Sequence, residues 1–290
     1  MMRLQALVLD GQEFTFTQGS NPGIYISDNI DGLDTPEFFE DTEALTGQYG
    51  DAIYNNLYRG RNIVIRGHIS KNDSSLYEGL RKTLVSLAAI NKDSSGQIIY
   101  KRLTIETTGG STYFTEGTVR LQMPWVAHTH APYMLFLHCP DPILYGDYHT
   151  SGLVTRPAGG GVMIPAMVPF TLSGGGGGSA ILVNGGNGPT WPILVLRGPL
   201  TSPRIYSQTL DRAFKLNYTL GVNDEVRINT SPFYETVLRN QTDNFITYVD
   251  DNDRDMFQLE PGNNIITFST NDPADTGSLE VLYYDGFIGI

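Results

Sequence analysis

Short runs in which apolar and polar residues alternate dominate this chain. In residues 225–229, for example, Val226 and Ile228 face one side of an extended chain and polar residues face the other. Alternation with a period of two is typical of half-buried β-strands. The pattern predicts strands over residues 4–9, 62–68, 97–107, 117–123, 134–138, 193–196, 224–228, 265–269 and 279–284.

One segment, residues 73–90, has a helical spacing instead. Ser75 and Glu78 have the spacing of a capping box, and turn-forming residues follow Asn91. The spacing predicts an amphipathic helix that covers a sheet or barrel and carries no chemistry. Its apolar face is formed by Leu76, Leu80, Leu84, Leu87 and Ala88.

The composition favours a mainly β chain with two domains. Of the 290 residues only 17% are charged, against about 25% in a typical globular protein. Tyr and Phe, which suit the half-buried surface of a sheet, are abundant. Glycine runs mark a connection over residues 156–180. We therefore expect one domain over residues 1–146, which holds the helix, and a second over residues 147–290, a sandwich of strands and turns.

Charge and cysteine content disfavour several kinds of partner. A net charge of −12 repels phosphate backbones and anionic membranes, so we expect no binding of nucleic acid by charge and no membrane partner. The single cysteine, Cys139, rules out a disulfide within the chain and fits a reducing compartment. The sequence has no run of about 18 apolar residues that would span a membrane. Residues 1–10 do not have the pattern of a signal peptide.

Catalytic motifs are absent from the sequence. It contains no nucleophile elbow, no zinc-protease helix motif and no phosphate loop. Cys139 directly follows His138, so on a strand the two side chains point to opposite faces, and a buried thiol is the better interpretation. We therefore expect no catalytic residue, no cofactor and no metal.

Two polar clusters leave a metal site as the less favoured alternative. His128 and His130 would share one face of a strand, as a pair of zinc ligands could, but a third ligand is not evident. The aspartates of residues 251–255 have part of the spacing of a calcium loop, but Met256 stands where such a loop needs glycine. An acidic hairpin turn is the preferred interpretation of that segment.

An acidic segment, residues 28–51, contains no Lys or Arg and is followed by three arginines. It is either a solvated loop before an exposed strand or a long loop that reaches a neighbouring subunit. In the second case the acidic segment and the arginines would form complementary surfaces of one contact. The candidate interface residues are Phe38, Phe39, Tyr54, Tyr58, Arg59 and Arg61, with Arg66 as the third arginine.

Trp191 is the one candidate carbohydrate contact. It lies between Thr190 and Pro192, and the prolines on either side place it at a strand start or a sheet edge. An exposed indole ring there could stack on a sugar, whereas packing under a loop is the commoner role of such a residue.

Residues 136–145, 181–193, 220–230 and 257–264 follow one another in an order and spacing that resemble a known family. The first segment is similar to the aromatic–x–Asp–Pro–x–x–Tyr boundary between the two domains of the siphophage distal tail proteins, often called Dit. The second is similar to their Asn–Gly–small–x–Pro–x–aromatic–Pro stretch. Residues 61–68, with the helix after them, are similar to the barrel and single flanking helix of the same family.

This resemblance implies an N-terminal tail-tube-like β-barrel or sandwich with one flanking helix and a C-terminal galectin-like β-sandwich. It implies a homo-hexameric ring that joins the tail-tube protein to the tail-tip hub or tail-associated protein. DNA would pass through the ring without specific binding. The chain would be a structural virion protein of the tail tip or baseplate, assembled in the host cytoplasm, and not an enzyme.

Three other functions are kept as alternatives. A carbohydrate-binding module that contributes to host-surface adhesion would expose several aromatic residues, of which Trp191 stands out. A tail-tube protein would stack into long tubes. A hydrolase is disfavoured by the missing catalytic motif.

Overall fold

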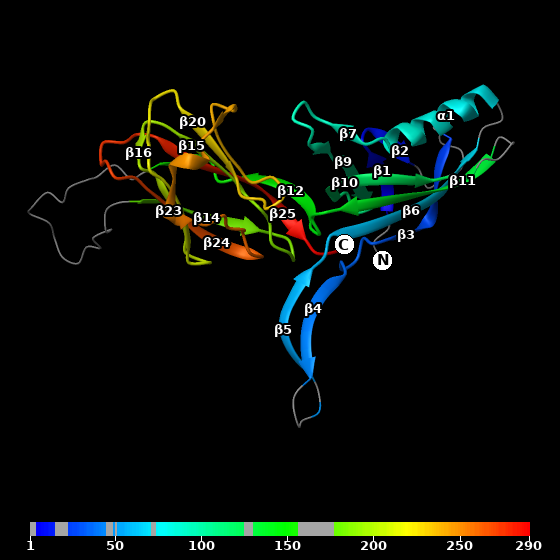
Figure 1. Ribbon diagram of the computed structural model, residues 1–290, viewed down its shortest axis with the longest axis horizontal. Helices are drawn as coiled ribbons and strands as arrows, with labels where there is room; N and C mark the ends of the chain where they lie inside the picture. The colour runs from blue at the N-terminus through cyan, green and yellow to red at the C-terminus, as the bar shows by residue number, and fades with distance from the viewer. Residues whose placement is uncertain are drawn as a thin grey trace, which may run out of the picture. The chain divides into compact units, whose positions relative to one another are not determined.

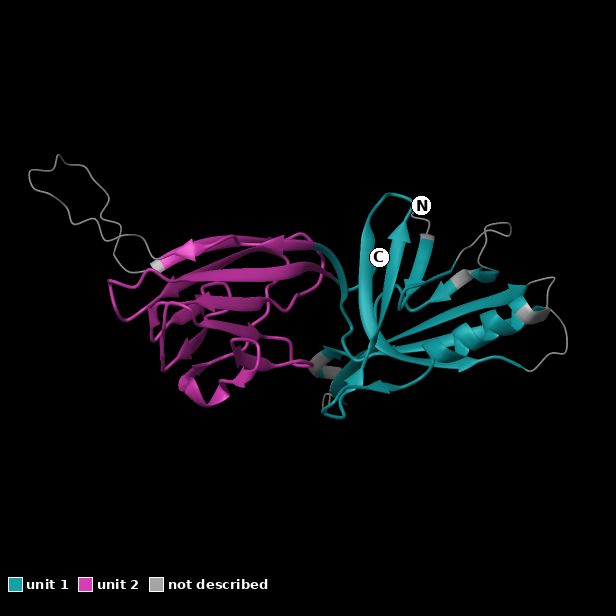
Figure 2. Ribbon diagram, turned by 90° about the horizontal axis from the view of Figure 1, so that it is seen from above, with its two compact units in different colours: residues 1–147, 287–290 teal, residues 148–286 magenta. Residues whose placement is uncertain are grey.

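The computed structural model describes residues 4–14, 23–44, 49, 51–70, 74–124, 130–155 and 177–290. Within these residues the chain is mostly β-strand with one α-helix (Figure 1). It divides into two compact units, unit 1 with residues 1–147 and 287–290 and unit 2 with residues 148–286 (Figure 2). The four C-terminal residues, which we expected in the second domain, lie in unit 1. In the described residues, no helix is long and apolar enough to cross a membrane.

Unit 1 contains the helix α1 (Ser74–Leu87). Its strands are β1 (Leu4–Leu9), β2 (Gln12–Phe14), β3 (Ile24–Asp31), β4 (Phe38–Ala44), β5 (Asp51–Tyr58), β6 (Arg61–Ser70), β7 (Asn91–Lys92), β8 (Ile98–Ile99), β9 (Lys101–Thr107), β10 (Thr112–Gln122) and β11 (His130–Cys139). The predicted strands of the first half are thus confirmed, and most of them extend further than the pattern indicated.

The long strand β10 joins two antiparallel ladders in unit 1. Its first half pairs with β9, which is followed by β1 and β2. Its second half pairs with β11, which is followed by β6 and β3. The change of partner falls at Gly117, where a Cβ atom would lie 2.5 Å from the carbonyl oxygen of His138, so a side chain would prevent the close approach.

Among the described residues the sheet of unit 1 is open, which corrects one part of the predicted fold class. β2 is only three residues long, and in the described part of the chain no ladder joins it to β3. Closure into a barrel needs every edge strand to pair, so the predicted barrel is wrong for these residues. The mainly β class with one flanking helix is confirmed.

The core of unit 1 follows from the period-two pattern. Alternate residues of β6 are buried, among them Ile63 and Ile65, and they pack together with residues of β1, β9 and β11. The helix contributes Tyr77 and Leu84 to this core, whereas Leu76, expected on its apolar face, is 56% exposed. The side chain of Ser75, the proposed helix cap, lies outside the described residues.

Unit 2 is a sandwich of two antiparallel sheets that enclose one apolar core. One sheet has the order β25-β15-β20-β21-β22, with β13 beside β25, and the other has the order β14-β24-β17-β18-β23. The bounds are β12 (Leu144–Thr150), β13 (Val154–Thr155), β14 (Gly177–Asn184), β15 (Ile193–Arg197), β16 (Leu200–Thr201), β17 (Arg204–Ser207), β18 (Arg212–Leu216), β19 (Thr219–Leu220), β20 (Glu225–Asn229), β21 (Thr236–Arg239), β22 (Asp243–Asn244), η1 (Ile246–Tyr248), β23 (Val249–Arg254), β24 (Gly262–Ser269) and β25 (Ser278–Phe287). The predicted sandwich is confirmed.

The Asn–Gly segment after β14 is fixed by a buried network. Asn184 is 1% exposed; its Nδ2 donates to the carbonyl oxygen of Gly188 (2.9 Å), and its Oδ1 accepts from the amides of Gly186 (3.1 Å) and Gly286 (3.0 Å). The carboxylate of Asp285 accepts from the next amide, that of Gly185 (2.6 Å). A turn that would otherwise leave its amides unsatisfied is thereby held in one conformation. Most of the connection over residues 156–180 lies outside the described residues.

Candidate interaction surfaces

Strands β4 and β5 form a hairpin, which we call the arm. The two strands pair only with each other among the described residues, and Figure 1 shows the hairpin standing away from the open sheet of unit 1. The sequence pattern predicts a loop over most of this segment. The arm is instead regular β-structure whose two strands have no described sheet beside them.

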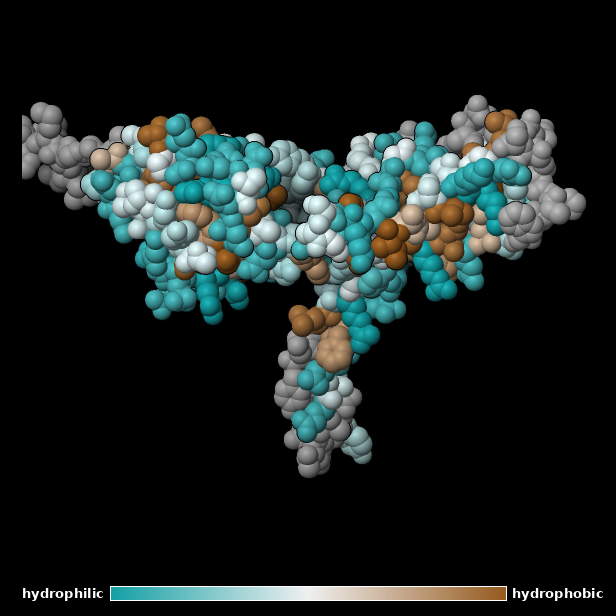
Figure 3. Space-filling model, turned by 45° about the horizontal axis from the view of Figure 1, so that its top comes forward, coloured by the Kyte–Doolittle hydropathy of each residue, from teal (hydrophilic) through white to brown (hydrophobic). Residues whose placement is uncertain are grey.

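The base of the arm is apolar on both faces. Phe38 lies opposite Tyr58 and Phe39 lies opposite Leu57. These two pairs are consecutive, so their side chains point to opposite faces of the hairpin. All four side chains are 44–59% exposed, and Figure 3 shows hydrophobic surface at the base of the arm. Each face thus presents one apolar cross-strand pair to its surroundings.

Further along β4 the arm becomes acidic. Glu40, Asp41 and Glu43 are exposed. Within the described part of the chain none of them has an ion-pair partner within 4.0 Å. The arm therefore combines an apolar base with an acidic outer part. The side chain of Tyr54, a candidate interface residue on β5, lies outside the described residues.

The three predicted arginines do not form one surface. Arg59 is exposed, and its guanidinium carbon lies 5.6 Å from the centre of the Phe39 ring. Arg66 forms an ion pair with Asp31 over 2.5 Å, and both side chains are partly exposed. Arg61 is only 1% exposed. A guanidinium inside unit 1 is not available to a neighbouring subunit, so we omit Arg61 from the proposed interface.

Arg61 acts instead as an internal anchor. It donates to the carbonyl oxygens of Gly32 (2.7 Å), Asp34 (2.6 Å) and Pro142 (2.9 Å), and also to that of Ile288. Burial lowers the pKa of Arg61, and the nearby Cys139, Asp34 and Asp141 oppose this shift. These carbonyl groups belong to the loop before the arm, the junction before β12 and the C-terminal residues.

Cys139 is a buried thiol on the inner face of β11. It is 0% exposed, and burial raises its pKa to about 11. At neutral pH it is therefore protonated and a poor nucleophile. His138 points outward, as expected for neighbours on a strand, and its Nδ1 lies 2.8 Å from Oδ1 of Asn62.

The histidines on β6 and β11 meet at one place. The rings of His68 and His130 have centroids 4.9 Å apart, and the ring of Tyr25 stacks on His68 at 5.2 Å. His128, the other half of the predicted pair, lies outside the described residues. Within the described ranges no group of three or more His, Cys, Asp or Glu side chains is arranged to hold a metal ion.

The predicted acidic turn over residues 250–255 is wrong. Most of it is strand β23. Lys215 pairs with Asp250 over 3.1 Å and Arg204 pairs with Asp253 over 2.6 Å. Lys215 lies on the neighbouring strand β18 and Arg204 on β17, the strand beyond it in the same sheet. Both cations offset the carboxylate charges, so the segment can lie in a sheet. Hydrogen bonds from the Asn252 amide and from Lys215 lower the pKa of Asp250 well below its ordinary value.

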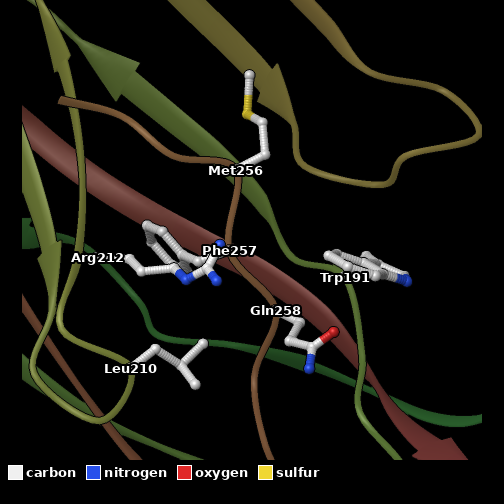
Figure 4. A pocket seen from close by; sticks show the side chains of 6 residues that line it. All are labelled: Trp191, Leu210, Arg212, Met256, Phe257 and Gln258. Atoms are coloured by element: carbon white, nitrogen blue, oxygen red, sulfur yellow. The ribbon is translucent and has the colours of Figure 1, made fainter. Parts of the chain in front are cut away.

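Trp191 is partly exposed and lines a pocket in unit 2 (Figure 4). Its neighbours there include Arg212 and Gln258, which come from distant parts of the sequence. Their proximity had no signal in the sequence pattern. The structure thus describes an arm with exposed apolar pairs, an internal arginine anchor and a small pocket.

Comparisons with solved structures show that this fold occurs in phage tail proteins. The chain has the fold of a crystal structure described as "SPP1 Dit (gp 19.1) Protein, a Paradigm of Hub Adsorption Apparatus in Gram-positive Infecting Phages", with a TM-score of 0.65 and 12% identity over 99% of both chains. Two structures of the phage P2 baseplate in its activated conformation, with Ca and with Sr, have TM-scores of 0.53 and 0.52 at 11% and 10% identity, over 96% of this chain and 97% of theirs. A search of curated proteins found no match.

A comparison with models of protein families finds a match in the second half of the chain. Residues 185–284 match the family model described as siphovirus-type tail component, C-terminal domain. The resemblance to the siphophage distal tail protein family, Dit, is therefore confirmed: residues 185–284 match the model of its C-terminal domain, and the chain has the fold of an SPP1 Dit structure. This match supports a structural role in a siphophage tail.

Proposed function

We propose that the chain forms a homo-hexameric ring at the distal end of the tail, between the tail-tube protein and the tail-tip or baseplate proteins. A closed ring needs head-to-tail contacts in which two different surfaces of each subunit meet. The arm supports such a contact. A hairpin with an apolar pair on each face is stabilised when both faces are covered by other chains, because that removes apolar surface from water.

The exposed residues of the arm base are Phe38, Phe39, Leu57 and Tyr58, together with Arg59 beside Phe39. The proposal rests on the exposure of these residues. Large exposed apolar groups that lie together mark interaction sites more often than isolated ones do. Aromatic residues and arginine are also enriched among the residues that dominate protein interfaces.

The acidic part of the arm and the net charge of −12 are compatible with a channel for DNA. Carboxylates that face a passing duplex repel its phosphates, so DNA would move through the ring without specific binding. A hydrolytic activity is not part of this proposal, because the family is structural.

The mass of the full-length protein in solution tests the proposal. Native mass spectrometry should give a species six times the mass of the 32.0 kDa chain, and negative-stain images should show rings with a central hole. A chain that remains monomeric at high concentration would overturn the proposal. Long tubes in the images would favour the tail-tube alternative instead.

A further inference from the structure

The pocket beside Trp191 has a volume of about 250 Å³ and is bounded by aromatic, aliphatic and polar side chains. We propose that it binds one pyranose unit of an uncharged glycan. The lining residues are Trp191, Leu210, Arg212, Met256, Phe257 and Gln258. This inference goes beyond a structural role in the tail, since it gives unit 2 a ligand of its own.

A single β-bridge sets the geometry of the pocket. Thr190 and Leu259 pair through two hydrogen bonds of 3.0 and 2.8 Å, and both side chains are fully buried. In an antiparallel pair the residues beside such a bridge, here Trp191 and Gln258, are cross-strand neighbours on the opposite face. Both therefore point away from the core, toward the pocket.

The other wall comes from the start of β18. The amide of Asp255 donates to the carbonyl oxygen of Ala213 over 2.9 Å, which places residues 256–258 between β18 and the bridge. Figure 4 shows this segment running between Trp191 on one side and Leu210 and Arg212 on the other. Phe257 is 1% exposed and belongs to the apolar core of unit 2. One side of the pocket is thus anchored in the core.

The chemistry of these side chains suits a sugar. The flat indole of Trp191 offers an apolar face to the C–H groups of a pyranose, and its size gives much contact area for little loss of conformational freedom. Arg212 is exposed and has several N–H donors. Gln258 donates through Nε2 to Glu260 over 2.7 Å, which leaves its amide oxygen as an acceptor. A sugar ring presents hydroxyl groups that can both donate and accept.

Size and charge narrow the ligand class. Pockets for drug-sized ligands span roughly 300–1,000 Å³, so a site of about 250 Å³ takes one ring rather than several. The carboxylate of Glu260 accepts a hydrogen bond from Gln258 of the lining. It offsets the positive charge of Arg212, which favours an uncharged ligand over a phosphate or a uronic acid. A nucleotide is disfavoured by the net charge of −12.

Ligand-detected saturation-transfer NMR on the full-length protein tests the site. The probes are the methyl glycosides of glucose, galactose, N-acetylglucosamine and rhamnose, with methyl glucuronide as the charged comparison. We expect a signal from at least one neutral glycoside and at least a ten-fold weaker affinity in Trp191→Ala and in Gln258→Ala. Trp191→Phe should retain part of the affinity, because it keeps an aromatic face.

The matched control is Phe233→Ala, which removes an exposed aromatic ring outside the residues that line the pocket and should leave the affinity unchanged. Gln258→Ala and Arg212→Ala carry the test if Trp191→Ala does not fold, because both side chains lie at the surface of unit 2. No signal from any of the four neutral glycosides would overturn the proposal. So would an equal signal in the wild type and in Gln258→Ala, or binding of the glucuronide alone.

Discussion

The guanidinium of Arg61 donates to the carbonyl oxygen of Asp34 over 2.6 Å. Asp34 lies in the loop that precedes the arm, and Arg61 begins the strand that follows it. The same guanidinium also holds carbonyl groups of Gly32, Pro142 and Ile288. One buried cation thus satisfies several backbone acceptors and fixes both ends of the arm to unit 1.

Replacing Arg61 with Met should destabilise unit 1. Methionine keeps much of the aliphatic volume but removes every donor, so four partly buried hydrogen bonds from the guanidinium to carbonyl oxygens are lost. Because hydrogen bonds to charged groups contribute about 1.5–3 kcal/mol each and do not add fully, we expect a loss of about 3 kcal/mol or more in the free energy of unfolding. Urea denaturation measures it.

The matched control for that change is Arg59→Met. Arg59 is exposed, so its replacement should change the free energy of unfolding by no more than about 0.5 kcal/mol. Equal effects of the two substitutions would show that the buried contacts of Arg61 contribute nothing of their own.

Much of the fold could be predicted from the period-two alternation, and Arg61 shows where that prediction stopped. Arg61, Ile63 and Ile65 are alternate residues of β6, so their side chains lie on the same face, where both isoleucines are fully buried. Its position on the inner face was therefore present in the pattern. The sequence nevertheless favours a surface position, because arginine is rarely buried without partners. The partners of Arg61 are carbonyl groups, which no sequence pattern displays.

The arm and the pocket were hidden for different reasons. Phe38 and Phe39 are adjacent, so the arm lacks the one-sided alternation of a strand on a core; both of its faces are exposed. Trp191 could be singled out, but its neighbours Arg212 and Gln258 approach it only through the bridge between Thr190 and Leu259. Thr190 and Leu259 are far apart in the sequence, so their pairing depends on the tertiary fold and leaves no local pattern.

Asn184→Ala should destabilise unit 2. The substitution removes two accepted hydrogen bonds and the donated bonds to Gly188 and Leu259 from a site that is 1% exposed. Groups left unsatisfied in a buried place cost about 1–3 kcal/mol each, so we expect a loss of about 2–4 kcal/mol in the free energy of unfolding. The exposed Asn263 on β24 provides the control, and Asn263→Ala should be close to neutral. Thermal unfolding of both variants measures the two losses. Equal losses would show that the hydrogen bonds of Asn184 do not stabilise unit 2.

Unit 1 should become less stable as the pH falls through the range in which histidine titrates. Burial and the neighbouring His130 lower the pKa of His68 below its ordinary value of 6.5. Below that pH the unfolded chain binds more protons than the folded one at this position. The stability from His68 is therefore present above pH 6.5 and is lost as the pH falls through the lower pKa of the folded state.

Hydrogen-exchange protection of the β6 and β11 amides, compared at about pH 7.5 and pH 5, measures this loss. His68→Phe keeps a ring beside Tyr25 and removes the titrating group, so the acid-induced loss of protection should shrink. His138→Phe, at a histidine on the outer face of β11, should leave it unchanged. A loss in His68→Phe as large as in the wild type would assign the pH dependence to other groups.

The two faces of the arm should each be required for assembly. Phe38→Ser with Tyr58→Ser removes the apolar pair of one face, and Phe39→Ser with Leu57→Ser removes that of the other. If the arm is covered on both faces in a head-to-tail ring, either double variant should shift the oligomer toward the monomer, because a ring opens wherever one contact is lost. The exposed Ile53 further along the arm gives a control, and Ile53→Ser should have a smaller effect. Native mass spectrometry across a concentration series separates the outcomes: loss with one double variant alone would mean that a single face is buried, and assembly unchanged in both would remove the arm from the subunit contact.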